Sequence, residues 1–119
     1  MEPLKLVVYH NDPGTAQALA VSLSQHCGAV KLAKHEEVRS VVARNRADVL
    51  VLDLETSVSD EIRTLHDEFP TLRIVGTHRL ADEKLWAEAL DQGADDLCEP
   101  RNDEVIRSVM RGNAQRAAA

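Results

Sequence analysis

The sequence predicts an α/β domain built on a doubly wound, five-stranded parallel sheet with helices on both faces. Short apolar runs of strand length alternate strictly with stretches whose apolar residues recur at helical spacing, and the links between them are short. One run, Val49–Leu52, is apolar at every position and is bounded by Asp48 and Asp53, which is typical of a central parallel strand covered on both faces. The chain of 119 residues, 44% of them hydrophobic, is long enough to bury a single core.

Runs rich in β-branched and aliphatic residues place the strands. They cover Leu4–Tyr9, Ala29–Ala33, Asp48–Asp53, Leu72–Gly76 and Asp95–Cys98. Lys31 interrupts the second run, which favours an edge strand with one face in water. Successive parallel strands require crossover connections, and these are right-handed.

Apolar residues at helical spacing predict the helices between the strands. The stripes are Ala16, Leu19, Ala20 and Leu23; Val38, Val41 and Val42; Ile62, Leu65 and Phe69; Trp86, Ala89 and Leu90; and Val105, Ile106, Val109 and Met110. Asp12 or Thr15 is available to cap the first helix, and Gly28 suits the left-handed position just past its end. The fourth helix is expected from Asp82 to Gln92.

The last helix is expected to fray at Gly112. The domain then covers residues 1–112, and residues 113–119 form a frayed tail or the start of a linker. The sequence shows no internal repeat and no other linker.

Composition and charge argue against two classes of protein. The net charge of −6 argues against direct nucleic-acid binding, which normally uses a basic surface. No apolar run approaches the roughly 20 residues of a spanning helix, and Glu2 and Lys5 interrupt any signal-peptide pattern, so we expect a cytoplasmic protein without membrane contact. In that reducing compartment Cys27 and Cys98 are expected to be buried, free thiols.

Polar side chains gather where the strands end. They are His10, Asn11 and Asp12 after the first strand, Asp53, Glu55 and Thr56 after the third, Thr77 and His78 after the fourth, and Glu99 after the fifth. In open parallel sheets the functional crevice lies at these carboxyl ends, so Asp53 is the candidate functional centre. The structural alternative is a carboxylate that caps the next loop. The rim histidines, His10 and His78, are expected to be solvated.

Three fragments, in this order and spacing, resemble the receiver domains of two-component response regulators over essentially the whole chain. They are Ala47–Leu54, which ends a strand in Asp53; Thr77, after the fourth strand; and Ala89–Asp96, which reads ALDQGADD. The resemblance implies a flavodoxin-like fold with strand order 2-1-3-4-5 and a non-enzymatic role in phosphorelay signal transduction. It also implies that Asp53 is the phospho-acceptor and Thr77 the switch hydroxyl.

The same resemblance implies a cofactor and partners. Mg²⁺ is the implied cofactor, with Asp12, Asp53 and Glu55 as candidate ligands, because carboxylate oxygens suit this hard cation. The implied partners are a histidine kinase or an output domain, and helices four and five are a candidate homodimer contact. Trp86, on the fourth helix, is either a ring folded over the edge of the core or an exposed anchor for a partner.

Departures from the family's pattern weaken the implied phosphorylation. His10 and Asn11 stand where the family has an adjacent acidic pair, and Asp12 comes one position late. Glu99 replaces the family's lysine, so a carboxylate that repels phosphate stands in place of a cation. Leu97 replaces the aromatic residue that usually reports the switch. The loss of one such electrostatic contact commonly raises the free energy of the transition state by a few kcal/mol.

Three functions are therefore carried forward, in this order. The first is a pseudo-receiver with weak or no phosphorylation at Asp53, which acts through protein–protein contacts. The second is a conventional Mg²⁺-dependent phospho-switch at the same residue. The third, a distant alternative, is a small-ligand or nucleotide-binding domain of the same topology, although the turn His10–Gly14 holds one glycine and lacks a glycine-rich phosphate loop.

Overall fold

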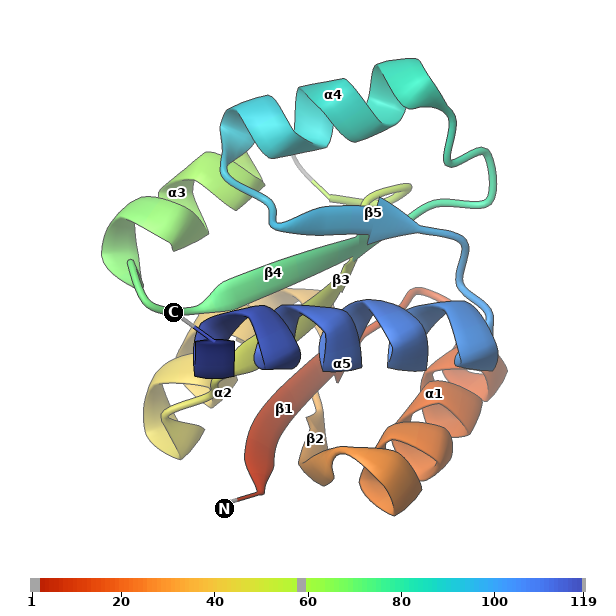
Figure 1. The fold of residues 1–119 in the computed structure, drawn as a ribbon, viewed down its shortest axis with the longest axis vertical. Helices are drawn as coiled ribbons and strands as arrows, with labels where there is room; N and C mark the ends of the chain where they lie inside the picture. Colours follow the sequence, from red (N-terminus) through yellow and green to blue (C-terminus); the bar gives the residue numbers. More distant parts are fainter. Residues whose placement is uncertain (1–2, 58–59, 119) are drawn as a thin grey trace.

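A parallel sheet in the order β2-β1-β3-β4-β5 runs through the middle of the molecule (Figure 1). The structure, a computed structural model, describes residues 3–57 and 60–118, and in the last helix side chains as far as Gly112. The strands are β1 (Leu4–Tyr9), β2 (Gly28–Leu32), β3 (Val49–Asp53), β4 (Arg73–Thr77) and β5 (Asp96–Cys98). The predicted fold class and strand order are confirmed, and no predicted strand boundary is displaced by more than one residue.

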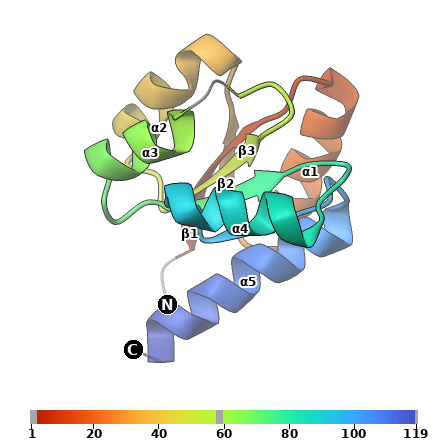
Figure 2. The same ribbon diagram turned by 90° about the horizontal axis from the view of Figure 1, so that it is seen from above.

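Helices cover both faces of this sheet (Figures 1 and 2). They are α1 (Pro13–His26), the 3₁₀ turn η1 (His35–Glu37), α2 (Val38–Asn45), α3 (Glu61–Glu68), α4 (Glu83–Gln92) and α5 (Asn102–Ala118). Helices α1 and α5 lie side by side on one face, and α2, α3 and α4 lie on the other. Within the described ranges, no helix combines the length and apolar character needed to span a bilayer.

The strands of the sheet divide the core into two aliphatic layers. Because successive side chains of a strand point to opposite faces, Leu50 and Leu52 of β3 pack toward α2, α3 and α4, while Val49 and Val51 pack toward α1 and α5. All four are at most 1% exposed. The unbroken apolar run therefore places the end of β3, Asp53, in the middle of the sheet between β1 and β4.

Two expectations about helix ends are corrected by the structure. Helix α5 continues through Gly112 to Ala118, so the expected fray at Gly112 is not observed. Gly112 packs against buried Arg73, and a Cβ there would overlap the guanidinium and force that side chain to shift. Gly28 does not adopt the left-handed cap position; it begins β2, where a Cβ would overlap the backbone of Leu4.

Both cysteines are free thiols, as expected. Cys98 is buried as predicted, whereas Cys27 is only half-buried, so the prediction of burial is met in part for Cys27. Burial, reinforced by the nearby carboxylate of Asp96, raises the pKa of the Cys98 thiol to about 12. Since the thiolate is the reactive form, iodoacetamide at mildly alkaline pH is expected to modify Cys27 slowly and Cys98 only after unfolding. Peptide mass mapping of the native and urea-unfolded protein tests this, and rapid native alkylation of Cys98 would contradict the burial described.

Candidate functional site

Asp53 occupies the centre of the rim formed by the carboxyl ends of the strands. Its residue is 0% exposed, and it is paired in register with Thr77 of β4. The sheet order reverses between β1 and β3, the kind of position at which open α/β sheets form their sites. The structure therefore places Asp53 where the sequence predicted it.

Both oxygens of the Asp53 carboxylate already accept hydrogen bonds. Oδ1 accepts the backbone N–H of Glu55 at 2.9 Å. Oδ2 accepts the backbone N–H of Asn11 at 3.1 Å and the hydroxyl of Thr56 at 3.2 Å. The carboxylate thus fastens the loop after β1 to the loop after β3, which is the loop-capping role that sequence reasoning kept as an alternative.

A chain of contacts leads from Asp53 to the opposite side of the rim. The hydroxyls of Tyr9 and Thr56 are 2.8 Å apart; since Thr56 donates to Asp53, it accepts from Tyr9. The Tyr9 ring stacks on His35 of η1, with centroids 5.0 Å apart, and His35 Nε2 lies 2.8 Å from a carboxylate oxygen of Glu61 in α3. Sequence reasoning missed Tyr9, His35 and Glu61, because nothing in the sequence pairs residues from three separate elements.

Asp12 is committed to helix α1. Its Oδ2 accepts the backbone N–H of Thr15 at 3.0 Å and the Thr15 hydroxyl at 2.7 Å. These two hydrogen bonds lower the pKa of Asp12 from its ordinary value. The cap predicted from the sequence is therefore present, and the same oxygen is not directed at Asp53.

Glu55 is held by Arg79, which follows β4. The Arg79 side chain donates to Glu55 Oε1 at 2.9 Å, and its backbone N–H donates to Oε2 at 3.3 Å. Burial acts to raise the pKa of Glu55, but the hydrogen bonds and the positive charge of Arg79 outweigh it, so the pKa is lowered. The carboxylate bridges the loops after β3 and β4.

Replacing Arg79 with alanine tests this bridge. The pKa of Glu55 is expected to rise toward its ordinary value, because the guanidinium donor and its positive charge are lost, while the backbone N–H of residue 79 and part of the burial remain. A carboxyl group whose pKa is lowered by folding stabilises the fold at pH values above its unfolded-state pKa, and this stabilisation is lost as the pH falls. The variant lacks most of that contribution, so its free energy of unfolding should fall less on acidification. Carboxyl-carbon NMR titration gives the pKa; an unchanged value would contradict the bridge. The neutral-pH loss should be small, because 79% of the Arg79 side chain is exposed.

Two buried polar atoms near Asp53 have no partner in the described part of the chain: His10 Nε2 and the Thr77 hydroxyl. His10 Nδ1 accepts the backbone N–H of Asp12 at 3.0 Å, which places the proton of the neutral ring on Nε2. His10 and His78 are both half-buried, so the expectation that they are solvated rim residues is wrong for His10 and only partly met for His78. Thr77 is 1% exposed.

The remaining predicted site residues lie farther out. Half of the Glu99 side chain is exposed, and a carboxylate oxygen lies 3.9 Å from the guanidinium of Arg101. Trp86 is 46% exposed, and its indole N–H donates to Asp96 at 3.2 Å. Asp96 also accepts from Ser108 of α5, so Trp86 crosses from α4 to β5 with one side in solvent. Its role as a partner anchor stays a prediction.

The three carboxylates named from the sequence do not fit a Mg²⁺ ion as they are arranged. Asp12 caps a helix, Glu55 pairs with Arg79, and both oxygens of Asp53 accept protein donors. Among residues 3–57 and 60–118, no group of three or more metal-ligating side chains converges on one point. Mg²⁺ prefers a near-octahedral set of oxygens, and these carboxylates would have to leave their present partners to supply it.

Comparison with known proteins agrees with the geometry of the sheet. No protein-family model and no curated protein matches the chain by sequence. A response regulator from Thermotoga maritima superimposes with a TM-score of 0.80 at 23% identity, over 93% of this chain and 97% of that one. The fold is that of a response-regulator receiver domain.

Two further structures with the receiver fold widen the comparison. The signal receiver domain of NarL from Mycobacterium tuberculosis gives a TM-score of 0.75 at 17% identity and covers 93% of this chain and 96% of its own. A CheY-like protein, TadZ from Pseudomonas aeruginosa, gives 0.67 at 25% identity and covers 87% and 91%. At such identities the likeness concerns the fold, and the function of this chain has to be argued from its own residues.

Proposed function

We propose that the chain is a receiver-like, non-enzymatic signalling module that acts through protein–protein contacts, with weak or no phosphorylation at Asp53. The observation that carries the proposal is the state of Asp53 itself. Its carboxylate is buried and accepts three hydrogen bonds from its own chain. A nucleophilic carboxylate needs access to the donor phosphoryl group, and this one is 0% exposed with a hydrogen bond on each oxygen.

The charges around the rim support the same proposal. A phosphoryl group brings about two negative charges to its site, which cations must neutralise. His10 and Asn11 stand where receivers carry acidic metal ligands, and Glu99 stands where they carry a lysine. Asp12 and Glu55, the nearest substitutes, have other partners. The resulting site lacks both the cation ligands and the fixed cation.

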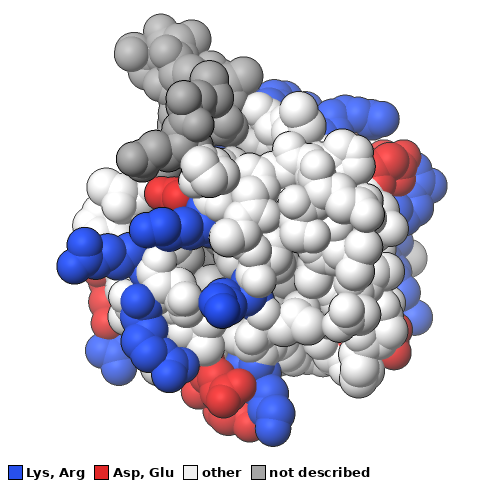
Figure 3. All heavy atoms as spheres, turned by 90° about the horizontal axis from the view of Figure 1, so that it is seen from below, with Lys and Arg blue, Asp and Glu red and all other residues white. Residues whose placement is uncertain are grey.

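One proposed contact face, on α1, carries few charges, and a second lies around Trp86 on α4. Helix α1 contains no Asp, Glu, Lys or Arg, although 29% of the chain is charged. Figure 3 shows a broad area free of these residues on the side where α1 lies. Val21 on α1 is 44% exposed, and Trp86 offers a second anchor on α4. A histidine kinase or an output domain is the proposed partner, and a homodimer through α4 and α5 is the alternative use of the Trp86 side.

Phosphotransfer measures the proposal directly. The protein is incubated with Mg²⁺ and acetyl phosphate, and its intact mass is followed; we expect no phosphoryl adduct. A variant with three substitutions, His10→Asp, Asn11→Asp and Glu99→Lys, restores the missing charges and should gain an adduct that Asp53→Asn abolishes. Stoichiometric phosphorylation of the unaltered chain at Asp53 would overturn the proposal and establish the Mg²⁺-dependent phospho-switch.

One observation favours that second function. The Thr77 hydroxyl is buried beside the end of β3 and has no partner among the described residues, so it is free to accept or donate a new hydrogen bond. A phosphoryl group on Asp53 would offer it an oxygen. Thr77→Val therefore separates the two functions: it leaves a pseudo-receiver's partner affinity unchanged and lowers that of a phospho-switch.

A further inference from the structure

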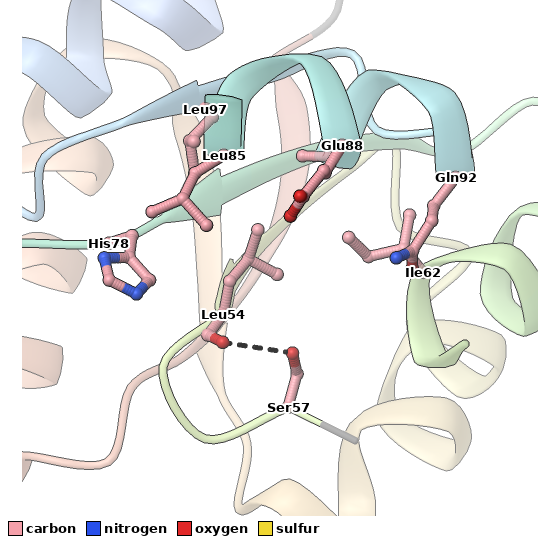
Figure 4. Close-up of a pocket in the computed structure, with 9 residues that line it drawn as sticks. Leu54, Ser57, Ile62, His78, Leu85, Glu88, Gln92 and Leu97 are labelled. Atoms are coloured by element: carbon pink, nitrogen blue, oxygen red, sulfur yellow. Dashed lines mark hydrogen bonds between the residues drawn. The ribbon is translucent and has the colours of Figure 1, made fainter. Parts of the chain in front are cut away.

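A pocket of about 190 Å³ lies between α3 and α4, and the loops that follow Asp53 and Thr77 line one side of it (Figure 4). Leu54, just past β3, and Leu97 of β5 form its floor, and Ile62 and Leu85 form facing walls on α3 and α4. The volume exceeds that of an engineered apolar cavity of about 150 Å³ that binds benzene. The pocket is therefore large enough for a ligand of that size.

The floor of this pocket is fixed by the sequence of β4. Gly76 lies beneath Leu54, and a Cβ at Gly76 would approach Leu54 Cδ1 to 2.5 Å. The absent side chain lets Leu54 settle onto the sheet. Ala89 of α4 is 3% exposed and lines the pocket. Its small side chain leaves space that a larger side chain at this position would fill. The shape of the cavity thus depends on Ala89, which lines it, and on Gly76, which lets Leu54 lie close to the sheet.

A single carboxylate stands over this apolar floor. Glu88 of α4 points across the opening in Figure 4, with the Gln92 amide on the same helix. No hydrogen bond or ion pair joins Glu88 to any residue within the described ranges, in contrast to Glu55, Glu61 and Glu68, and Lys84 one turn away is not within ion-pairing distance. Ser57 and His78 line the pocket as well, and Glu88 is exposed to solvent. Because Glu88 is the carboxylate of this lining, an occupant with an apolar body and a positive charge complements it.

We propose that the α3–α4 pocket binds a small organic cation, an ammonium group attached to an aromatic or branched aliphatic body about the size of benzene. The body fills the space over Leu54 and Leu97, and the ammonium group pairs with Glu88. Because Leu54 follows Asp53 and His78 follows Thr77, an occupant contacts neighbours of both residues. A second expectation, that an occupant alters the loop around Asp53, rests on the proposed function. The binding of the occupant to the pocket does not rest on it.

The probes are benzylammonium, benzyl alcohol and benzoate, which share one ring and differ in charge. In a ¹H–¹⁵N NMR titration, benzylammonium is expected to shift the amides of Leu54, Leu85 and Leu97 in a saturable way. It should bind about fivefold more tightly than benzyl alcohol, the upper end of what one exposed ion pair allows, and benzoate should bind least. Equal affinities for all three probes, or no saturable shifts at the pocket, would overturn the proposal.

Variants of α4 distinguish binding in the pocket from nonspecific binding of the cation to the acidic surface. Glu88→Gln should remove the preference for benzylammonium over benzyl alcohol, whereas Glu83→Gln, on the same exposed helix but outside the pocket, should keep it. Ala89→Leu should abolish binding of every probe; if that variant does not fold, Leu85→Phe fills the same space. Binding that survives filling of the pocket would contradict the assignment. Phosphotransfer from acetyl phosphate does not involve these residues, so the two proposals fail separately.

Discussion

Asp53→Ala is expected to lower the free energy of unfolding by about 2 kcal/mol, because buried donors that lose their acceptor cost about 1–3 kcal/mol each and part of this is offset by removing a buried charge. The variant leaves the N–H groups of Asn11 and Glu55 without an acceptor and releases the hydroxyl of Thr56. Urea unfolding followed by circular dichroism measures the change.

The control for Asp53 is Asp91→Ala. Asp91 is exposed on α4 and makes no hydrogen bond or ion pair in the described structure, so its replacement should change stability by no more than about 0.5 kcal/mol. A neutral or stabilising Asp53→Ala would mean that the buried carboxylate is kept at a cost to the fold. Such costs are usual at functional sites, and that outcome would favour the phospho-switch over the pseudo-receiver.

Gly28→Ala is expected to have a larger effect, a loss of about 3 kcal/mol, because the clash is with backbone and no rotamer relieves it. A Cβ at Gly28 would overlap the carbonyl oxygen of Leu4 and lie 2.7 Å from its nitrogen. Leu4 and Gly28 are register partners at the start of the β1–β2 ladder, so β2 must move outward. Amide hydrogen exchange should report faster exchange along β2.

Gly14→Ala is the matched control. The nearest atom to a Cβ at Gly14 is Asp12 Oδ2 at 3.6 Å, which is an ordinary contact, and the residue lies in the first turn of α1. Alanine there should leave stability unchanged or raise it by up to about 1 kcal/mol through helix propensity. If both glycine variants lose similar stability, close approach of β1 and β2 is not the reason for Gly28.

The fold was predictable because the decisive signals are local. The apolar run of β3 requires cover on both faces, and that requirement placed Asp53 at the centre of the sheet. Gly112 shows the limit of such signals. In sequence it indicates a helix end, yet in the structure the helix continues, and Gly112 lies where a Cβ would overlap the guanidinium of Arg73 from β4.

The position of the site was predictable from the sequence, but the hydrogen-bond partners of its side chains were not. Strand ends gave the rim residues, since the carboxyl ends of parallel strands share one edge. The bond between Glu55 and Arg79 joins residues 24 apart, and the hydroxyl contact of Tyr9 and Thr56 joins residues 47 apart. Side-chain orientation over such separations depends on how the loops fold, which no local pattern encodes.

The central claim, that Asp53 is a hydrogen-bonded structural carboxylate and not an open phospho-acceptor, is tested most directly by titrating the protein with Mg²⁺ and beryllofluoride, which mimics a bound phosphoryl group. The amides of Asn11, Glu55 and Thr77 are followed by ¹H–¹⁵N NMR, because the first two donate to Asp53 and the third faces it. We predict no saturable shift of these amides at millimolar concentrations. Saturable shifts that require both Mg²⁺ and beryllofluoride would contradict the claim.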